Sequence, residues 1–480
     1  MKGKNLLFLL LLTLGALFIH GYHPWAEDAE LYLPGVEKLL HPELFPFNAQ
    51  FFEPHANATF FPNLIAASIR LSHLPFDTAL LLWHLATIFL FLLACSELSG
   101  RCFADAKARW AGVALMAALL TLPVAGTALY IMDQYLNPRN LSAFATIFAV
   151  VRTLDRKYFQ AAWFLVFAAA IHPLMSVFAL SYCILLVGFE RSKFFSGLAA
   201  WLPFGLSLSP PPPAYHQVAL THSYHYLTRW KWYEWLGALA PLLILWWFSR
   251  LARSRRLRNV DLLCRALLIY ELVYLPAALV LSIPPRFEAL ARVQPMRSLY
   301  LLYIIMFLVA AGLLTECLLK DRVWAWILVL LPLSLGMFVA QRALFPGSAH
   351  LEWPGSHPRN RWVNAFLWVR NNTPKDAIFA LNPNFMNIDR EDEQGFRAVA
   401  ERSRMADVGK DAGAVSMFPL LADEWWRQVQ AQAGWNQFQL QDFRRLEADY
   451  GVSWVIVEQP DLPGLHCPYQ NEAVKVCQLQ

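Results

Sequence analysis

Charged residues are scarce in this sequence. Asp, Glu, Lys and Arg make up only 16% of its 480 residues, whereas hydrophobic residues make up 57%. The mean hydropathy is accordingly high, at +0.37. A chain of this length with so little charge is too apolar for a water-soluble protein. The composition therefore excludes a soluble globular protein and predicts an α-helical polytopic membrane protein.

The motifs of common soluble enzymes are also missing. The sequence has no glycine-rich phosphate-binding loop, no CxxC pair and no GxSxG turn, so it does not indicate nucleotide, thiol-redox or serine-hydrolase chemistry. It shows no internal repeat of the kind found in inverted-repeat transporters. The net charge of +5 comes from loops between apolar runs, so it indicates membrane topology and no nucleic-acid partner.

Apolar runs fill the first 345 residues. A transmembrane helix needs roughly 20 apolar residues, and about 11 such helices are expected. Their ranges are 6–22, 75–98, 111–130, 139–152, 159–172, 174–189, 195–209, 235–249, 262–283, 299–319 and 323–345. The first resembles a signal peptide without a cleavage site, so it is expected to stay as a helix. The fourth to sixth are too short to cross open lipid alone and are expected to line an enclosed cavity.

The distribution of Lys and Arg predicts the orientation of these helices, because short cytoplasmic loops retain positive charge. One side carries most of it, at Lys2, Lys4, Arg101, Lys107, Arg109, Arg152, Arg156, Lys157, Arg191, Lys193, Arg250, Arg253, Arg255, Arg256, Arg258, Lys320 and Arg322. The sequence therefore predicts a multi-pass protein of the inner (plasma) membrane with a cytoplasmic N-terminus.

Two regions are expected to lie outside the membrane on its outer side. Residues 1–345 form the transmembrane domain, interrupted by a long first outer loop at about 23–74. Residues 346–480 begin with a Pro- and Gly-rich linker and have the composition of a soluble domain. Helical and β-rich patterns alternate there, so a small extracytoplasmic α/β domain is predicted.

Cysteine placement bears on the same topology, because exported domains form disulfides more readily than cytosolic ones. Five of the seven cysteines fall in or beside predicted spans. The other two, Cys467 and Cys477, are ten residues apart in the predicted exported domain. They are predicted to form a disulfide, with two unpaired thiols as the alternative.

Acidic residues gather where the chain leaves the first span. Glu27 and Asp28 begin an amphipathic segment, and a second such segment ends the loop; both are expected to lie along the membrane interface. Glu37, Glu43 and Glu53 are interpreted as ordinary solvated residues. Asp28 could be a simple helix cap. We favour a functional role for Glu27 and Asp28, because a poorly hydrated carboxylate at a helix end is suited to accept a proton.

This combination resembles the GT-C superfamily of membrane glycosyltransferases, which use polyprenyl-phosphate sugars as donors. The resemblance rests on the acidic pair after the first span, the long first loop, the many spans and a tail that opens with VRNNTPKDAIFA at residues 369–380. It implies that Asp28 is the catalytic base, with Glu27 as partner or substitute. Members often have two Asp where this chain has Glu-Asp. The family's second outer acid corresponds to Asp133, for acceptor binding or for a divalent metal ion shared with Asp28.

Several other residues are candidates for the same site. The departing lipid phosphate needs cations, and Arg286, Arg292 and Arg297 lie in one predicted outer segment, where snorkelling at the interface is the alternative. Arg139 follows Asp133 in a polar turn that could instead be a plain helix cap. His172 interrupts an apolar run and is expected to face the cavity or to be a packed, satisfied histidine.

The resulting hypothesis is an inverting transfer from a lipid-linked sugar donor to an acceptor hydroxyl on a glycan, lipid or protein. Asp28 would accept the proton, and Arg292 or Arg297 would neutralise the phosphate. Two alternatives stay open: a transporter, flippase or ligase for lipid-linked glycans, and a non-catalytic membrane assembly protein.

Overall fold

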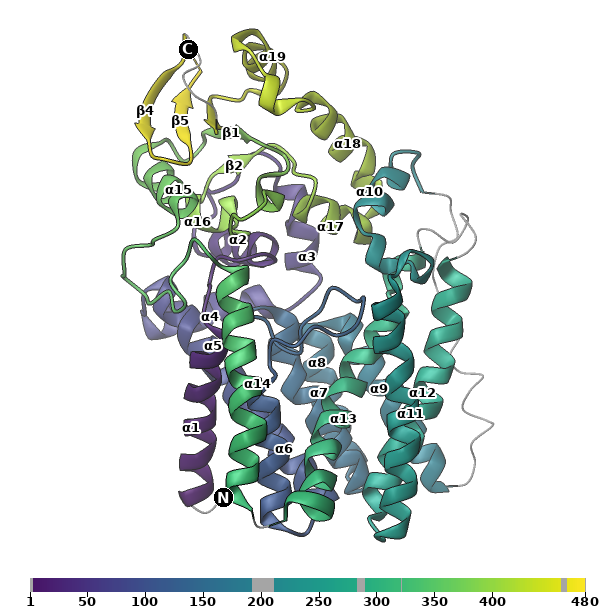
Figure 1. Cartoon of the computed structure of the whole chain (residues 1–480). Coiled ribbons are helices and arrows are strands. Elements are labelled where there is room, and N and C mark those ends of the chain that lie inside the picture. The colour runs from purple at the N-terminus through teal and green to yellow at the C-terminus, as the bar shows by residue number, and fades with distance from the viewer. Residues whose placement is uncertain (1–2, 192–210, 283–289, 321, 459–463, 480) are drawn as a thin grey trace. The chain divides into compact units, whose positions relative to one another are not determined.

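The computed structural model describes residues 3–191, 211–282, 290–320, 322–458 and 464–479 (Figure 1). These residues divide into two compact units. The first unit, which we call the helical unit, contains residues up to Gly21, Leu82–Ser209 and Ser223–Ala340. The second, the mixed unit, contains Tyr22–Leu81, Pro210–His222 and Gln341–Gln480. The first loop thus belongs to the same unit as the C-terminal tail.

Long apolar helices make up the helical unit. They are α1 (Gly3–His20), α5 (Phe76–Cys102), α6 (Ala106–Ala118), α7 (Pro138–Leu154), α8 (Tyr158–Ile171), α9 (Pro173–Arg191), α11 (Trp232–Ser254), α12 (Arg258–Ser282), α13 (Ser298–Leu314) and α14 (Val323–Leu344). Helices α7, α8 and α9 pack together, as do α11 with α12 and α6 with α13. Helix α13 lies at the centre, since nearly all of its side chains are buried.

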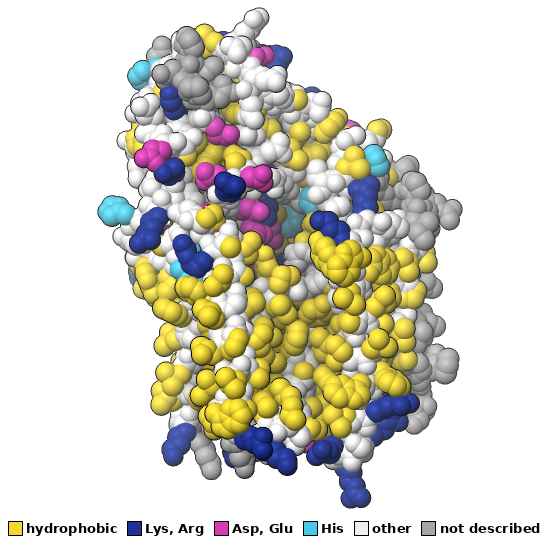
Figure 2. Space-filling view, viewed as in Figure 1, with side chains coloured by type: hydrophobic (Ala, Val, Ile, Leu, Met, Phe, Trp, Pro, Cys, Tyr) yellow, Lys and Arg dark blue, Asp and Glu magenta, His cyan; other side chains and the backbone are white. Residues whose placement is uncertain are grey.

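Seven helices of the described chain are long and apolar enough to cross a membrane: α1, α5, α9, α11, α12, α13 with the residues around it, and α14. The surface of helix α14 indicates that lipid surrounds this unit. Its exposed side chains include Trp324, Leu328 and Leu331, each at least 60% exposed, and water would not tolerate such an apolar surface. Figure 2 shows hydrophobic side chains covering the helices of this unit, with Lys and Arg at their ends.

The structure alters some of the predicted spans. The span predicted at 111–130 is wrong in its second half, because α6 ends at Ala118 and the chain then folds irregularly as far as Asn137. Helices α6, α7 and α8 are shorter than a full crossing. The span predicted at 195–209 lies outside the described residues. A total of eleven crossings therefore stays a prediction.

The mixed unit combines short helices with a five-stranded sheet. Its helices are α2 (Ala29–Leu40), α3 (Glu53–Asn57), α4 (Phe61–Ser72), α10 (Tyr215–Thr221), α15 (Arg361–Asn372), α16 (Phe396–Ala400), α17 (Lys410–Met417), α18 (Ala422–Ala431) and α19 (Leu440–Tyr450). Its strands are β1 (Ile378–Leu381), β2 (Ser403–Arg404), β3 (Trp454–Val457), β4 (His466–Gln470) and β5 (Lys475–Gln478). The tail thus combines helices with a sheet, as its sequence pattern indicates.

The sheet has the strand order β2-β1-β3-β5-β4. Strand β1 is parallel to β2 and β3, whereas β5 is antiparallel to both β3 and β4. The central strand β3 is completely buried, as expected for an apolar run covered on both faces. Cys467 and Cys477, on β4 and β5, are joined by a disulfide bond.

The first loop covers the β2 edge of this sheet. The backbone N–H of Phe47 donates to Ser403 Oγ at 3.1 Å, and Asn48 Nδ2 donates to the Arg404 carbonyl at 2.9 Å. Asn48 also exchanges hydrogen bonds with the Gln428 side chain on α18. These contacts join segments more than 350 residues apart in sequence, so the loop is an integral part of the mixed unit.

Candidate functional site

The residues predicted to carry catalysis lie at the start of α2. Asp28 occupies the N-cap position, but its side chain makes no capping hydrogen bond. Its carboxylate instead accepts a hydrogen bond from Lys410 Nζ at 3.2 Å, and a carboxylate oxygen of Glu27 lies 3.6 Å from the same ammonium. Glu27 has a positive φ of 49°, a backbone conformation that non-glycine residues rarely adopt. Asp28 is therefore not a simple cap.

A third carboxylate, that of Glu393, belongs to the same group. The Glu27 backbone N–H donates to the Glu393 carbonyl at 2.8 Å. Although burial opposes it, the charges of Asp28, Glu27 and Glu393 raise the pKa of Lys410. Burial, followed by repulsion from Asp28, raises the pKa of Glu393 against the opposing effect of Lys410. We call these four residues the Lys410 cluster; it holds three carboxyl groups and one ammonium.

A second group of charges lies immediately behind the first and is fully buried. Glu30 Oε1 accepts from Arg404 Nε at 2.9 Å and from Arg397 Nη1 at 3.4 Å. The Arg397 guanidinium donates to both carboxylate oxygens of Asp411, at 2.8 and 3.0 Å, and Arg404 forms an ion pair with Asp407. We call these five residues the Glu30 network. Every one of them is at most 2% exposed at its side chain.

The Glu30 network contains three carboxyl groups and two guanidinium groups. Burial raises the pKa of Glu30 and of Asp407, against the opposing effects of the two arginines. For Asp411 the effects of Arg397 and Arg404 outweigh burial, and its pKa is lowered. Each of the three acids therefore contacts at least one of the two guanidinium groups. Such pairing is what makes buried charge tolerable in a protein interior.

Helices α2 and α17 each contribute to both groups. On α2, Asp28 belongs to the Lys410 cluster and Glu30 to the Glu30 network. On α17, Lys410 and its neighbour Asp411 are divided in the same way, because consecutive helical residues point in different directions. The buried network thus fixes the two helices that hold Asp28 next to Lys410.

A cavity of about 240 Å³ lies at the beginning of the first loop, a few residues before Asp28. Its lining includes Trp25, Trp353, Asp77, Glu352 and Arg370. The Glu352 carboxyl is 2.9 Å from His23 Nδ1; burial raises its pKa to about 8 and lowers that of His23 to about 3. The pair is therefore a hydrogen bond between neutral groups at neutral pH. Trp25 is three residues from Asp28, hence at most about 11 Å away along the chain.

The prediction that Glu37 is a solvated residue is wrong. Its side chain is 2% exposed, and among the described residues neither carboxylate oxygen has a hydrogen-bond partner. Burial raises its pKa well above the ordinary value. The sequence places it on the polar face of α2, but α4, α16 and α17 all pack on this helix. Whether α2 lies along a membrane interface stays a prediction. Glu43 and Glu53 are exposed and paired with Lys375 and Lys38, as expected of solvated acids.

Asp133 and Arg139 lie in the helical unit and pair with each other. The Arg139 guanidinium donates to Asp133 Oδ2 at 2.5 Å, as does the Asn137 side chain. Asn137 Oδ1 in turn accepts the backbone N–H of Asn140 and caps α7. All of these side chains are buried. Here the structure favours the capping interpretation of the polar turn over a ligand-binding role.

The remaining candidates have varied surroundings. Arg292 and Arg297 are half-buried, and Arg297 lines a cavity of only about 10 Å³ with Gln294 and His225, which is room for about one water molecule. Arg286 lies outside the described residues. His172 is buried and its Nδ1 accepts the Met175 backbone N–H at 3.3 Å, at the start of α9, so it is a satisfied, packed histidine. A role for the arginines in phosphate binding stays a prediction.

Sequence reasoning identified Asp28 and Glu27 but missed Glu30 and every residue of the tail that pairs with them. The run RSRMADVGKDAG at residues 402–413 is rich in charged residues. This was the one feature of the sequence that could have indicated these partners. Within the described parts of the chain, no three His, Cys, Asp or Glu side chains come together in a way that could hold a metal ion. Comparison of the sequence with protein-family models and with curated proteins finds no match.

Proposed function

We propose that this chain is a membrane glycosyltransferase that moves a sugar from a polyprenyl-phosphate donor to an acceptor hydroxyl. The observation that carries the proposal is the position of Asp28, a carboxylate 29% exposed and held 3.2 Å from Lys410. In the reaction, Asp28 accepts the hydroxyl proton while the acceptor oxygen attacks the anomeric carbon. The bond from that carbon to the phosphate oxygen breaks, and the donor leaves as a lipid phosphate.

The composition of the Lys410 cluster supports a base at this place. Three carboxyl groups lie around one ammonium, so acidic groups outnumber the cation in this cluster. The Glu30 network, by contrast, is fully buried and has two guanidinium groups for its three carboxyl groups. Partly exposed carboxylates that are held in place by a buried network are typical of a site that transfers protons.

The cavity lined by Trp25 and Trp353 supports a sugar as the substrate. Trp353 is 50% exposed, and an exposed indole face can pack against the apolar face of a sugar ring. The carboxyl groups of Asp77 and Glu352 can accept or donate hydrogen bonds to its hydroxyls. A cavity that combines aromatic and apolar side chains with a few convergent polar groups is the usual form of a small-ligand site.

The seven membrane-crossing helices support a lipid-linked donor, because such a substrate stays in the bilayer. In the orientation that the positive charges favour, the N-terminus is cytoplasmic, and the mixed unit works on the outer side of the plasma membrane. Arg292 and Arg297 remain the candidates for the departing phosphate. A transporter or an assembly protein would also need membrane helices, but neither role explains why three acidic side chains gather around Lys410.

The test is an assay of the full-length protein, purified in mild detergent, with radiolabelled polyprenyl-phosphate sugars and a panel of glycan and lipid acceptors. We expect Asp28→Asn to lower the transfer rate by roughly 10²- to 10⁴-fold, the contribution of a general base. Glu43→Gln is the matched control, since this exposed acid forms only a surface pair with Lys375.

Two results would contradict the proposal. Full activity in Asp28→Asn would remove the base. Transport of lipid-linked sugars by the wild-type protein in vesicles, with no new glycosidic bond for any donor, would make the chain a transporter.

A further inference from the structure

The helical unit has a basic end, where helices α5, α7, α9 and α11 finish and α12 begins. Several of the arginines there are paired with acids. Arg101 contacts Glu97 and Asp155, Arg152 contacts Asp155, and both Arg253 and Arg265 contact Asp261. In Figure 2 dark-blue side chains mark the ends of the helices, below the hydrophobic band. This is the level at which lipid head groups meet a membrane protein.

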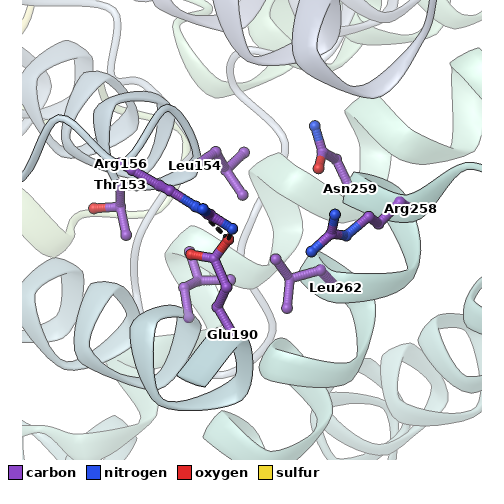
Figure 3. Close-up of a pocket in the computed structure, with 8 residues that line it drawn as sticks. Thr153, Leu154, Arg156, Glu190, Arg258, Asn259 and Leu262 are labelled. Carbon is purple, nitrogen blue, oxygen red and sulfur yellow. Dashed lines mark hydrogen bonds and ion pairs between the residues drawn. The ribbon is translucent and has the colours of Figure 1, made fainter. Parts of the chain in front are cut away.

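A cavity of about 220 Å³ opens within this basic end. Figure 3 shows that Arg156, in the turn after α7, and Glu190, at the end of α9, point toward each other, while Arg258 at the start of α12 approaches from the opposite side. Arg156 Nε donates to Glu190 Oε1 at 2.7 Å. Among the described residues, the Arg258 guanidinium has no acidic partner. Two guanidinium groups therefore face one carboxylate, which leaves one positive charge uncompensated.

The other walls of the cavity suit an amphipathic ligand. Leu154, Leu186 and Leu262 supply an apolar side. Asn259 is fixed by a hydrogen bond from its Nδ2 to the Arg101 carbonyl at 2.7 Å. Arg258 is the first residue of the 25-residue helix α12, whose unpaired N–H groups and dipole favour an anion at this end. Cationic, polar and apolar groups thus line one opening at the rim of the hydrophobic band.

We propose that this cavity binds the phosphate of an anionic phospholipid from the leaflet at the basic end of the helices. The phosphodiester would lie between Arg156 and Arg258, and its single negative charge would match the single excess positive charge. Arginine is suited to this task because its planar fork can donate two hydrogen bonds to one phosphate. The glycerol and the start of the acyl chains would pack on the leucines. Basic pockets between membrane helices are known to bind lipid head groups in this way.

Bound lipid would join the end of α7 and α9 to the start of α12. This role is independent of the proposed sugar transfer, since none of its residues belongs to the mixed unit.

Native mass spectrometry of the full-length protein in non-ionic detergent tests the proposal. We expect phosphatidylglycerol to be retained and phosphatidylcholine, whose head group is zwitterionic, to be lost. Arg258→Gln should reduce phosphatidylglycerol retention by about tenfold, the effect of one charge-assisted contact. Arg255→Gln, which removes an exposed arginine that does not line the cavity, is the control and should retain the lipid.

A second variant guards against loss of folding. Glu190→Gln removes the carboxylate that competes for Arg156, so it should increase phosphatidylglycerol retention, which an unfolded protein could not do. Equal retention in Arg258→Gln and Arg255→Gln would overturn the proposal, as would equal binding of phosphatidylcholine. Displacement of the lipid by inorganic phosphate at millimolar concentration would identify a site for free phosphate instead and overturn the lipid assignment.

Discussion

Asp28 and Glu30 are two residues apart at the start of α2, yet their carboxylates have opposite surroundings. Glu30 is fully buried between Arg397 and Arg404, in a network where every acid contacts a guanidinium group. Asp28 is partly exposed and shares Lys410 with Glu27 and Glu393. Both groups pair acidic with basic side chains, and both draw residues from α17 and from the start of α2.

The difference shows how structural and functional charge can be told apart within one helix. Buried charges that hold the fold together need a partner for each group, because an unpaired ion in the interior is very costly. A site for chemistry keeps a group that is not fully satisfied and that a substrate can reach. A structural group and a functional group of charges are therefore distinguished by their exposure and by their number of oppositely charged partners, rather than by residue type.

The sharpest way to test this comparison is a pair of isosteric variants. Glu30→Gln removes the buried carboxylate that contacts both Arg397 and Arg404, so we expect the free energy of unfolding to fall by about 3–5 kcal/mol. Asp28→Asn should change it by less than about 1 kcal/mol, as for other partly exposed ion pairs. Thermal unfolding of both variants in detergent measures the difference. Equal losses would show that the two groups form one structural unit.

A smaller effect is expected from Lys410→Gln, and it should appear in the pH dependence of transfer. Because the three carboxylates raise the pKa of Lys410, its ammonium must in turn favour their ionised forms. Without it, deprotonation of the base needs a higher pH, so the acidic limb of the rate profile should move upward and the rate at pH 6 should fall about tenfold. Lys410→Arg, which keeps the charge, should largely restore the profile. A uniform loss at every pH would indicate a purely structural role.

The smallest effect concerns Glu37, a buried acid that belongs to neither group. Its raised pKa means that the folded protein binds a proton that the unfolded chain releases above about pH 4.5. Stability from this group is therefore lost as the pH rises above that value. Glu37→Gln should raise the unfolding temperature, and by more at pH 8 than at pH 5. Glu53→Gln, at an exposed acid, is the control; a lower unfolding temperature for Glu37→Gln would contradict the interpretation.

The sequence predicted the membrane helices because apolar runs bounded by basic residues have few alternatives. It also indicated Asp28, since an acid directly after a span is conspicuous. The end of α6 at Ala118 was missed because residues 119–130 are as apolar as a helix, and their fold depends on contacts such as that of the Tyr300 hydroxyl with the Ile131 carbonyl. The partners of Glu30 were missed for the same physical reason: Arg397 and Arg404 lie more than 360 residues away. A single sequence carries no local signal for such pairing.

The hydrogen bonds of Phe47 and Asn48 to the edge of β2 have a practical meaning for anyone who wishes to study the tail by itself. In a fragment of residues 346–480 the edge strand β2 would be uncovered, and exposed strand edges pair with other molecules. We expect that fragment to aggregate on expression, whereas the same fragment fused through a flexible linker to residues 22–81 should stay monodisperse in gel filtration. A stable, monomeric tail fragment would show that the loop is dispensable for its folding.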